Sequence, residues 1–308
     1  ILDGDSARID EPLATAMLRK AIDQGLNYVD TAWPYHMEQS EPLVGRILQD
    51  GYREKVFLAT KMPSWLVKSP EDLELLFTTQ LERLQTDHID FYLLHALNAG
   101  YWDNYLKLKV FDWAERKMAE GQIRHLGFSF HDRYEVFERI LNGYDNWSFC
   151  QLQYNYMDVD EQAGQRGVLE AAEKGLGVIV MEPLRGGKLA VQNPPAQVAE
   201  AFRHSQRDWT MAEWALQWLW DQKEVSLLLS GMSTMEQVEQ NLQSASRSGV
   251  GSLTDHDRET IRRVQQAWSG LAPVPCTGCE YCMPCPNGVQ IPRIFKLYNE
   301  STMYDRQG

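Results

Sequence analysis

IDFYLLHA, at residues 89–96, is a short and almost wholly apolar run. Six further runs share its length, its richness in Val, Ile, Leu and Phe, and its polar or Gly/Pro boundaries. They are LNYVDTA (26–32), KVFLATK (55–61), IRHLGFSF (123–130), SFCQLQYN (148–155), GVIVMEPL (177–184) and VSLLLSGM (225–232). Runs of this kind are typical of strands that are buried on both faces of a parallel sheet.

Amphipathic stretches separate these runs and predict helices. The expected helices cover residues 11–25, 69–85, 132–142, 162–175, 210–221, 234–246 and 254–268. Such regular alternation predicts βα units wound into an α/β fold, the (β/α)8 TIM barrel. Seven strands are found, so we expect that the first strand of the barrel is missing from this sequence.

The organisation of the chain follows from this pattern. Residues 1–268 are expected to form the barrel, 269–275 (SGLAPVP) a linker, and 276–308 a cysteine-rich tail. The segment 97–109, after the third run, is expected to be a loop that shapes the pocket together with the tail. The tryptophan-rich stretch 208–220 is expected to serve core or subunit packing.

Composition excludes several classes of function. The formal charge of −13, without a basic cluster, argues against nucleic acid and acidic membranes as partners. No apolar stretch approaches the roughly 20 residues that span a bilayer. The first residues lack the features of a secretory signal, and one cysteine in the first 275 residues is no disulfide framework. A cytoplasmic location is therefore expected.

Chemically active side chains fall at the ends of the first three runs, where barrel enzymes place their sites. They are Asp30, Tyr35, Lys61 and His95. A nearby ammonium favours a phenolate, a carboxylate holds that ammonium, and a neutral histidine can orient a carbonyl oxygen. Taken singly, Lys61 would be a solvated cation and His95 a core histidine. Together, the four predict a site that protonates an oxygen as a carbonyl accepts hydride.

The sequence resembles the aldo-keto reductase family in these same stretches. The matching segments are NYVDTAWPYHMEQSE (27–41), LATK (58–61), DFYLLHAL (90–97), GQIRHLGFSF (121–130), QLQYN (151–155), EPLRGGKL (182–189) and SGMSTMEQVEQNL (230–242). The resemblance implies that Tyr35 is the general acid, that Lys61 and Asp30 tune it, and that His95 orients the carbonyl.

The resemblance also implies a nicotinamide cofactor. Ser129 and Gln151 match residues that grip the carboxamide, although the family more often has Asn after that serine where Phe130 stands here. The remaining implied cofactor-binding residues are Glu182, Pro183, Leu184, Gly186, Gly231, Ser233, Gln237 and Asn241. Met232 and Gln237 stand where a cation would meet the NADPH 2′-phosphate, so both NADPH and NADH stay open.

Four of the five cysteines lie in PCTGCEYCMPCP (275–286), at positions 276, 279, 282 and 285. Three consecutive C-x2-C steps favour a [4Fe–4S] cluster bound by Cys276, Cys279, Cys282 and Cys285. Zinc and free or disulfide-bonded thiols remain alternatives. The segment resembles the first half of a ferredoxin-like tail found in one branch of the family, whose second cysteine motif is not in this sequence. Two outcomes therefore stay open, a single [4Fe–4S] cluster on these four cysteines or an incomplete and empty site. Nicotinamide moves two electrons and a cluster one, which favours a structural or sensing role over electron transfer.

These observations predict an NAD(P)H-dependent oxidoreductase that transfers hydride between nicotinamide and a small-molecule carbonyl or alcohol, with an iron–sulfur tail. Two alternatives remain open. One is a barrel aldolase that uses Lys61 as a Schiff-base nucleophile. The other is a nicotinamide-binding redox sensor with little turnover that signals to a redox partner protein.

Overall fold

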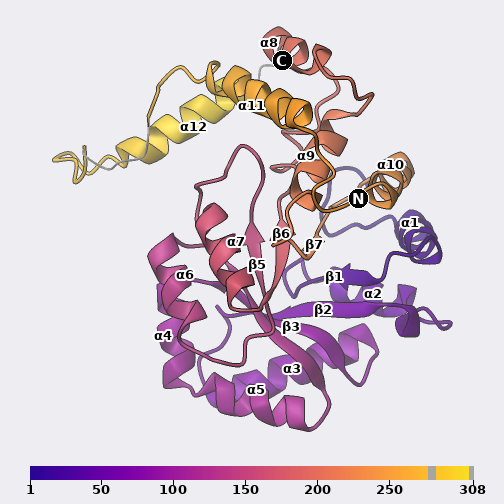
Figure 1. Cartoon of the computed structure of the whole chain (residues 1–308). Coiled ribbons are helices and arrows are strands. Elements are labelled where there is room, and N and C mark those ends of the chain that lie inside the picture. Colours follow the sequence, from indigo (N-terminus) through magenta and orange to yellow (C-terminus); the bar gives the residue numbers. More distant parts are fainter. Residues whose placement is uncertain (277–281, 305–308) are drawn as a thin grey trace.

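The computed structural model describes residues 1–276 and 282–304, and it confirms all seven predicted strands. The strands are β1 (Tyr28–Asp30), β2 (Phe57–Met62), β3 (Ile89–Leu97), β4 (Ile123–Phe130), β5 (Phe149–Gln153), β6 (Gly177–Met181) and β7 (Leu227–Leu228). They form one parallel sheet in chain order (Figure 1). The carboxyl ends of all strands therefore meet along one side of the sheet.

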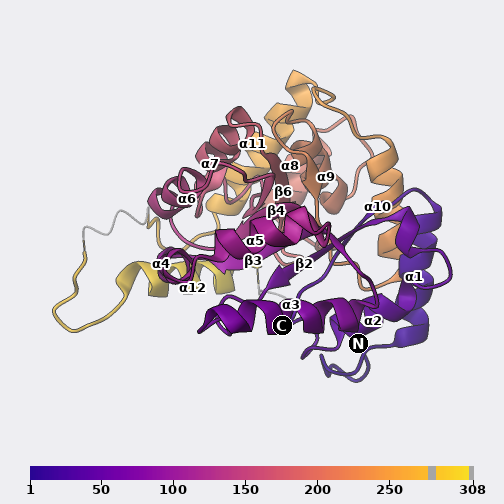
Figure 2. The same ribbon diagram turned by 90° about the horizontal axis from the view of Figure 1, so that it is seen from below.

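The sheet is an open half-barrel rather than a closed ring of eight strands. Within the described residues, β1 and β7 are its two edges and do not pair with each other. Seven parallel strands in sequential order agree with the predicted (β/α)8 architecture, whereas the eighth strand that would close the ring is not among them. Helices surround the sheet when it is seen from below (Figure 2).

The seven predicted helices are confirmed with boundaries shifted by a few residues. They are α1 (Glu11–Asp23), α3 (Pro70–Leu84), α6 (Tyr134–Leu141), α7 (Gly164–Glu173), α9 (Met211–Trp220), α10 (Met235–Ser246) and α11 (Asp255–Ser269). Five α-helices were not predicted. They are α2 (Ser40–Ile47), α4 (Ala99–Lys107), α5 (Val110–Ala119), α8 (Ala196–Arg203) and α12 (Ile291–Tyr304).

Local chemistry explains where several of these helices begin. Ser69 caps α3 in a capping box with Asp72, with Pro70 in the first turn as predicted. The expected loop at 97–109 is wrong, because Asn98 accepts a hydrogen bond from the Tyr101 amide and starts α4 there. Trp102 is buried and holds α4 against the core.

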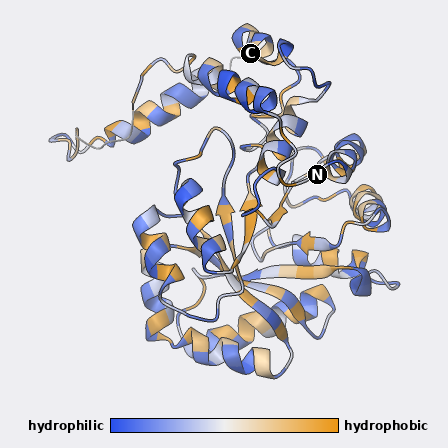
Figure 3. Ribbon diagram, in the orientation of Figure 1, coloured by the Kyte–Doolittle hydropathy of each residue, from blue (hydrophilic) through white to orange (hydrophobic). Residues whose placement is uncertain are grey.

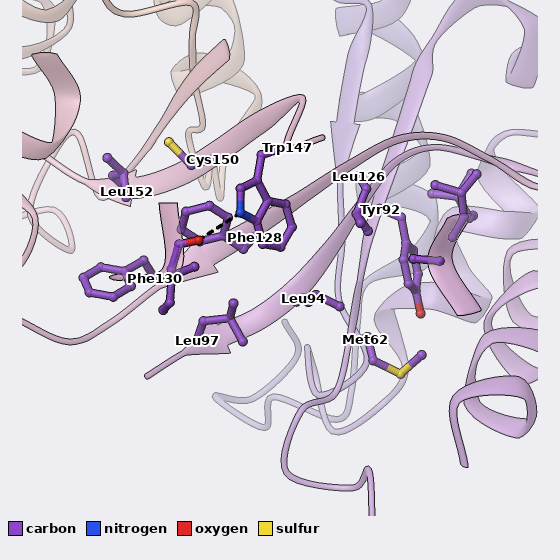
Figure 4. Packing of buried hydrophobic residues seen from close by; sticks show 14 of the residues in the cluster. Met62, Tyr92, Leu94, Leu97, Leu126, Phe128, Phe130, Trp147, Cys150 and Leu152 are labelled. Carbon is purple, nitrogen blue, oxygen red and sulfur yellow. Dashed lines mark hydrogen bonds between the residues drawn. The ribbon is translucent and has the colours of Figure 1, made fainter. Parts of the chain in front are cut away.

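The alternation of side chains along each strand separates two packed layers. The layer beneath the helices includes Tyr92, Leu94 and Phe128, with Trp147 packed 4.8 Å from Phe128 (ring centroids) (Figure 4). Cys150 belongs to this layer and is fully buried, and burial raises the pKa of its thiol. Figure 3 shows the strands as largely hydrophobic and the surrounding helices as mixed.

The other layer lies on the inner face of the half-barrel and contains Ala59, Leu93, Phe149 and Ile179. Two residues further along a strand a side chain points to the same face. The inner-face positions that follow these residues on β2, β3 and β5 are Lys61, His95 and Gln151. The strand pleat thus directs polar side chains to one end of the inner face.

A separate apolar cluster joins the later helices. Trp214 of α9 and Trp268 of α11 are both buried in it, together with Met303 of α12. Trp209 packs edge-on against Trp214 at 4.8 Å. The predicted packing role of the tryptophan-rich stretch is thus confirmed for the core. In Figure 1, α11 and α12 lie beyond the arrowheads of β5 and β6.

Candidate active site

Lys61, near the carboxyl end of β2, is a fully buried charged group. Its Nζ donates to both carboxylate oxygens of Asp30, at 2.6 and 2.8 Å, and to the Thr31 carbonyl at 2.9 Å. Burial alone would lower the pKa of the Lys61 ammonium, but the Asp30 charge and hydrogen bonds outweigh it and raise that pKa. Lys61 is therefore held as a fully buried and protonated ammonium.

Tyr35 covers that ammonium. The Lys61 Nζ lies 5.0 Å from the centroid of the Tyr35 ring, and Tyr35 is 37% exposed. The next three residues, His36, Met37 and Glu38, all have positive φ, at 53°, 52° and 67°. Left-handed backbone costs a non-glycine residue roughly 1–2 kcal/mol. The turn that carries Tyr35 is therefore strained, as turns at functional sites often are.

His95 stands beside Tyr35 as a neutral imidazole. Burial, together with the Lys61 charge and His131, lowers the pKa of His95 to about 3. Its ring lies 6.2 Å from the Tyr35 ring and 5.3 Å from the Trp65 ring (centroids). In the described part of the chain its buried Nδ1 has no hydrogen-bond partner. The four catalytic candidates are thus brought together by the first three strands.

Ser129 and Gln151 extend the site onto β4 and β5, and both are buried. The Ser129 hydroxyl oxygen accepts a 2.8 Å hydrogen bond from the Ala96 amide, next to His95. Gln151 Nε2 makes only a 3.5 Å contact with the Met181 sulfur. The buried Oε1 of Gln151 finds no partner among the described residues. A buried amide oxygen without a donor is costly, so this atom is suited to a ligand N–H.

A polar network behind Lys61 was not predicted from the sequence. Glu41 is fully buried and accepts from Thr60 at 2.6 Å and from Gln80 at 2.7 Å. Gln80 also donates to the Lys61 carbonyl at 3.0 Å. This network holds the backbone carbonyl of Lys61 in place. Glu41 stands within WPYHMEQSE, but only its burial distinguishes it from Glu38, the other acidic residue there.

The predicted cofactor-binding residues after β6 form a tight turn. Glu182, Arg185, Gly186 and Gly187 have positive φ, and the Arg185 amide bonds to the Glu182 carbonyl at 3.0 Å. Pro183 and Leu184 lie between them. Asn155 Nδ2 donates to the Glu182 carbonyl at 3.3 Å, which ties this turn to the loop after β5.

The remaining cofactor-binding candidates lie after β7. Gly231 and Ser233 precede α10, whose N-cap is Thr234, and Gln237 and Asn241 lie on α10 itself. The Gln237 side chain accepts a 2.7 Å bond from the Ser233 amide, and Asn241 donates to Ser230 at 3.0 Å. An anion at this helix end would therefore have to replace Gln237 at the Ser233 amide.

The structure does not test the four predicted iron–sulfur ligands as a set, because Cys279 lies outside the described residues. Cys276 and Cys282 are exposed, and Cys285 is half-buried. Across residues 1–276 and 282–304, no group of three or more His, Cys, Asp or Glu side chains is placed to hold a metal ion. The cluster therefore stays a prediction from spacing.

A half-barrel of parallel strands with polar side chains gathered at the carboxyl ends is the architecture of a barrel enzyme. The chain belongs to the aldo/keto reductase family, whose sequence profile matches residues 2–264. It is accordingly an oxidoreductase. The same part of the chain carries all four catalytic candidates.

Individual relatives are similar over most of their length. L-galactose dehydrogenase of Arabidopsis thaliana is 27% identical over 83% of this chain and 84% of its own. The NADH-specific methylglyoxal reductase of Escherichia coli is 25% identical over 84% and 89%. Aldo-keto reductase AKR11C1 from Bacillus halodurans (holo form) superimposes with a TM-score of 0.70 at 26% identity, covering 84% and 89%. A Klebsiella pneumoniae aldo-keto reductase in complex with NADPH gives 0.68 at 25%, covering 83% and 85%. Within the described ranges, no helix is long and apolar enough to cross a membrane.

Proposed function

We propose that this protein reduces the carbonyl group of small aldehydes or ketones, or oxidises the corresponding alcohols, with a nicotinamide nucleotide. The observation that carries the proposal is the buried Lys61 ammonium, bonded to Asp30 and covered by the Tyr35 ring at 5.0 Å. A phenol over a fixed ammonium is a proton donor whose conjugate base is stabilised in place. Family membership supports the same reaction.

Each residue then has a definite task. Tyr35 donates its proton to the carbonyl oxygen of the substrate, and Lys61 stabilises the phenolate that remains. Asp30 keeps Lys61 protonated and fixed. His95, neutral because of its low pKa, offers an N–H to the same oxygen without adding a second positive charge. When bound, the nicotinamide supplies the hydride for the carbonyl carbon.

The residues present fit a nicotinamide. The unpartnered Gln151 Oε1 can accept from the carboxamide of the cofactor, and the Ser129 hydroxyl lies on the adjacent strand. One relative is described as NADH-specific and one structural neighbour contains NADPH. In this chain Met232 and Gln237 provide no cation for a 2′-phosphate, which favours use of NADH as well as NADPH. Methylglyoxal, the substrate named for the E. coli relative, is the first carbonyl to test.

The aldolase alternative requires a neutral amine on Lys61 to attack a carbonyl. Asp30 opposes this, because it raises the pKa of Lys61 and occupies two of its donor directions. The sensor alternative requires nucleotide binding without turnover. The geometry favours the reductase over both, since Tyr35 lies exposed at the mouth of the site where a substrate would meet it.

The test is an assay of the purified protein with NADPH or NADH and a panel of small aldehydes that includes methylglyoxal. We expect oxidation of the nucleotide that depends on the aldehyde, with one alcohol formed per nucleotide. Tight nucleotide binding without turnover on any aldehyde would support the sensor instead. Borohydride that fixes a carbonyl compound onto Lys61 would support the aldolase.

The four-cysteine tail is a separate proposal that rests on spacing alone. We expect a single [4Fe–4S] cluster on Cys276, Cys279, Cys282 and Cys285. An anaerobic absorbance spectrum with iron and sulfide assays tests it, repeated after addition of reduced nucleotide. Bleaching by the nucleotide would indicate electron transfer, and an unchanged spectrum a structural role. Protein without iron would refute the cluster.

A further inference from the structure

The last described helix, α12, contacts the turn after β6, whose residues the family resemblance assigns to the cofactor. Arg185 of that turn donates to the Tyr304 hydroxyl and pairs with Glu300 at 3.2 Å. Lys188 pairs with the other Glu300 oxygen, also at 3.2 Å. The contacts join residues more than a hundred positions apart, so they are tertiary contacts and not local turn structure.

Arg185 is also held from the opposite side. Its Nε donates to the buried Asp158 carboxylate at 2.9 Å, and Asp158 in turn accepts from Asn155 at 3.1 Å. Only 13% of the Arg185 side chain is exposed, so these ion pairs are largely shielded from solvent. Shielded, multiply bonded pairs hold their geometry far better than exposed ones.

Helix α12 is itself anchored independently of Arg185. Met303 is buried, and the Tyr304 ring lies 4.6 Å from the Trp268 ring of α11 (centroids). Asn299 exchanges two hydrogen bonds with the Val274 backbone, at 2.9 and 2.7 Å. A fixed helix that bonds to a turn can restrain that turn.

We infer that α12 clamps the 182–189 turn through Glu300 and Tyr304, and that Arg185 is a positioning residue for the nicotinamide nucleotide. The inference rests on the proposed function, because it requires that the cofactor expected at this turn from the family resemblance is a nicotinamide nucleotide. Arg185 and its neighbours need left-handed backbone, which is unfavourable for a side chain and persists only where surrounding contacts enforce it. Release of the clamp would let the turn relax before the nucleotide binds, so nucleotide affinity would fall while the catalytic groups stay intact.

The test compares Glu300→Gln, Tyr304→Phe and their double variant with the full chain. We expect the double variant to raise the Kd and KM for NADPH roughly tenfold, with kcat for methylglyoxal within a factor of two. Lys296→Gln is the matched control. Lys296 lies on the same helix but pairs with Glu161 at 2.8 Å and not with a residue of the turn, so the affinity of this variant for NADPH should match that of the wild type.

Hydrogen–deuterium exchange of residues 183–189 provides a second readout. Exchange should be faster in the double variant and unchanged in the control. A double variant with wild-type Kd and wild-type exchange would overturn the clamp. A wild-type protein that binds no nicotinamide nucleotide would instead refute the proposed function, and exchange in the turn would still show whether α12 restrains it.

Discussion

At the scale of single residues, Asp30 and Lys61 depend on each other. Lys61 is fully buried and the Asp30 side chain nearly so, and each supplies the counter-charge of the other. Removal of one partner from a buried pair leaves a charge that neither water nor protein compensates. Such losses cost roughly 3–5 kcal/mol.

We therefore predict that Asp30→Asn lowers the free energy of unfolding by roughly 3 kcal/mol. The double variant Asp30→Asn/Lys61→Met should recover part of that loss, because it removes the stranded ammonium as well. Urea unfolding measures both. Asp50→Asn, which breaks the exposed pair with Arg19, is the control and should leave stability unchanged. Equal stability of Asp30→Asn and the wild type would show that the folded protein does not need Asp30 to compensate the charge of Lys61.

His95 makes stability depend on pH. Its pKa is about 3 in the folded protein against 6.5 when unperturbed, so between these values the unfolded chain binds a proton that the folded chain rejects. Stability must therefore fall as pH falls below about 6.5, at up to about 1.4 kcal/mol per pH unit.

The measurement is urea unfolding of the wild type and His95→Asn at pH 7 and pH 5. The stability difference between the two proteins should shift in favour of the variant at pH 5, since the variant lacks the titrating imidazole. An identical pH dependence in both proteins would mean that His95 is not held neutral by burial.

Asp30, Lys61 and His95 could be predicted from sequence because each lies near the end of an apolar run, and the alternation of a strand fixes which face it points to. Tyr35 lies in the turn that follows the first run, and it was predicted from its place beside these three. Glu41 and Gln80 could not be predicted. Gln80 lies on α3 and reaches the Lys61 carbonyl only after α3 has packed on β2. A polar residue inside a helix carries no sequence signal that distinguishes a buried bonding partner from a solvated one.

At the scale of elements, the turn between β1 and α2 stores strain beside Tyr35. Met37 has a positive φ of 52° and is 67% exposed, so its side chain has little packing to offset the cost of this backbone conformation. Glycine adopts this backbone without penalty. A single substitution of Met37 by glycine should therefore relieve this strain.

We predict that Met37→Gly stabilises the protein by about 1 kcal/mol. Met37→Ala is the control, because it removes the same exposed side chain but keeps the Cβ atom, and it should bring no gain. Thermal unfolding of the three proteins decides the matter. If alanine stabilises as much as glycine, the exposed side chain and not the backbone is the cause.

The strands were more predictable than the helices for a physical reason. Each strand is a continuous apolar run because helices cover one face and the barrel interior the other. The unpredicted helices are short or rich in aromatic residues, and tertiary contacts maintain them. Helix α4, for example, contains Gly100 and depends on the buried side chains of Trp102 and Tyr105.

At the scale of the whole molecule, one end of the half-barrel gathers contributions from the entire chain. The catalytic candidates come from β1 to β3, the carboxamide candidates from β4 and β5, and the clamped turn from the segment after β6. The turn is held by residues of α12 more than a hundred positions later. Contacts between residues so far apart in the sequence form only in the folded chain, so no local sequence pattern predicts them.

Nucleotide binding and proton transfer are expected to depend on different residues. The nucleotide is expected to contact the turn after β6, α10 and Gln151, whereas the proton is expected from Tyr35. Tyr35→Phe removes one hydroxyl from a partly exposed ring and leaves the Lys61–Asp30 pair in place. It should therefore affect turnover without affecting nucleotide affinity.

The most direct test of the central claim is the turnover of Tyr35→Phe with NADPH and methylglyoxal, measured together with its Kd for NADPH. We predict that kcat falls by at least roughly 100-fold, as expected for loss of a general acid, while Kd stays within a factor of two of the wild type. A variant that retains wild-type kcat would contradict the assignment of Tyr35 as the proton donor, and with it the proposed mechanism.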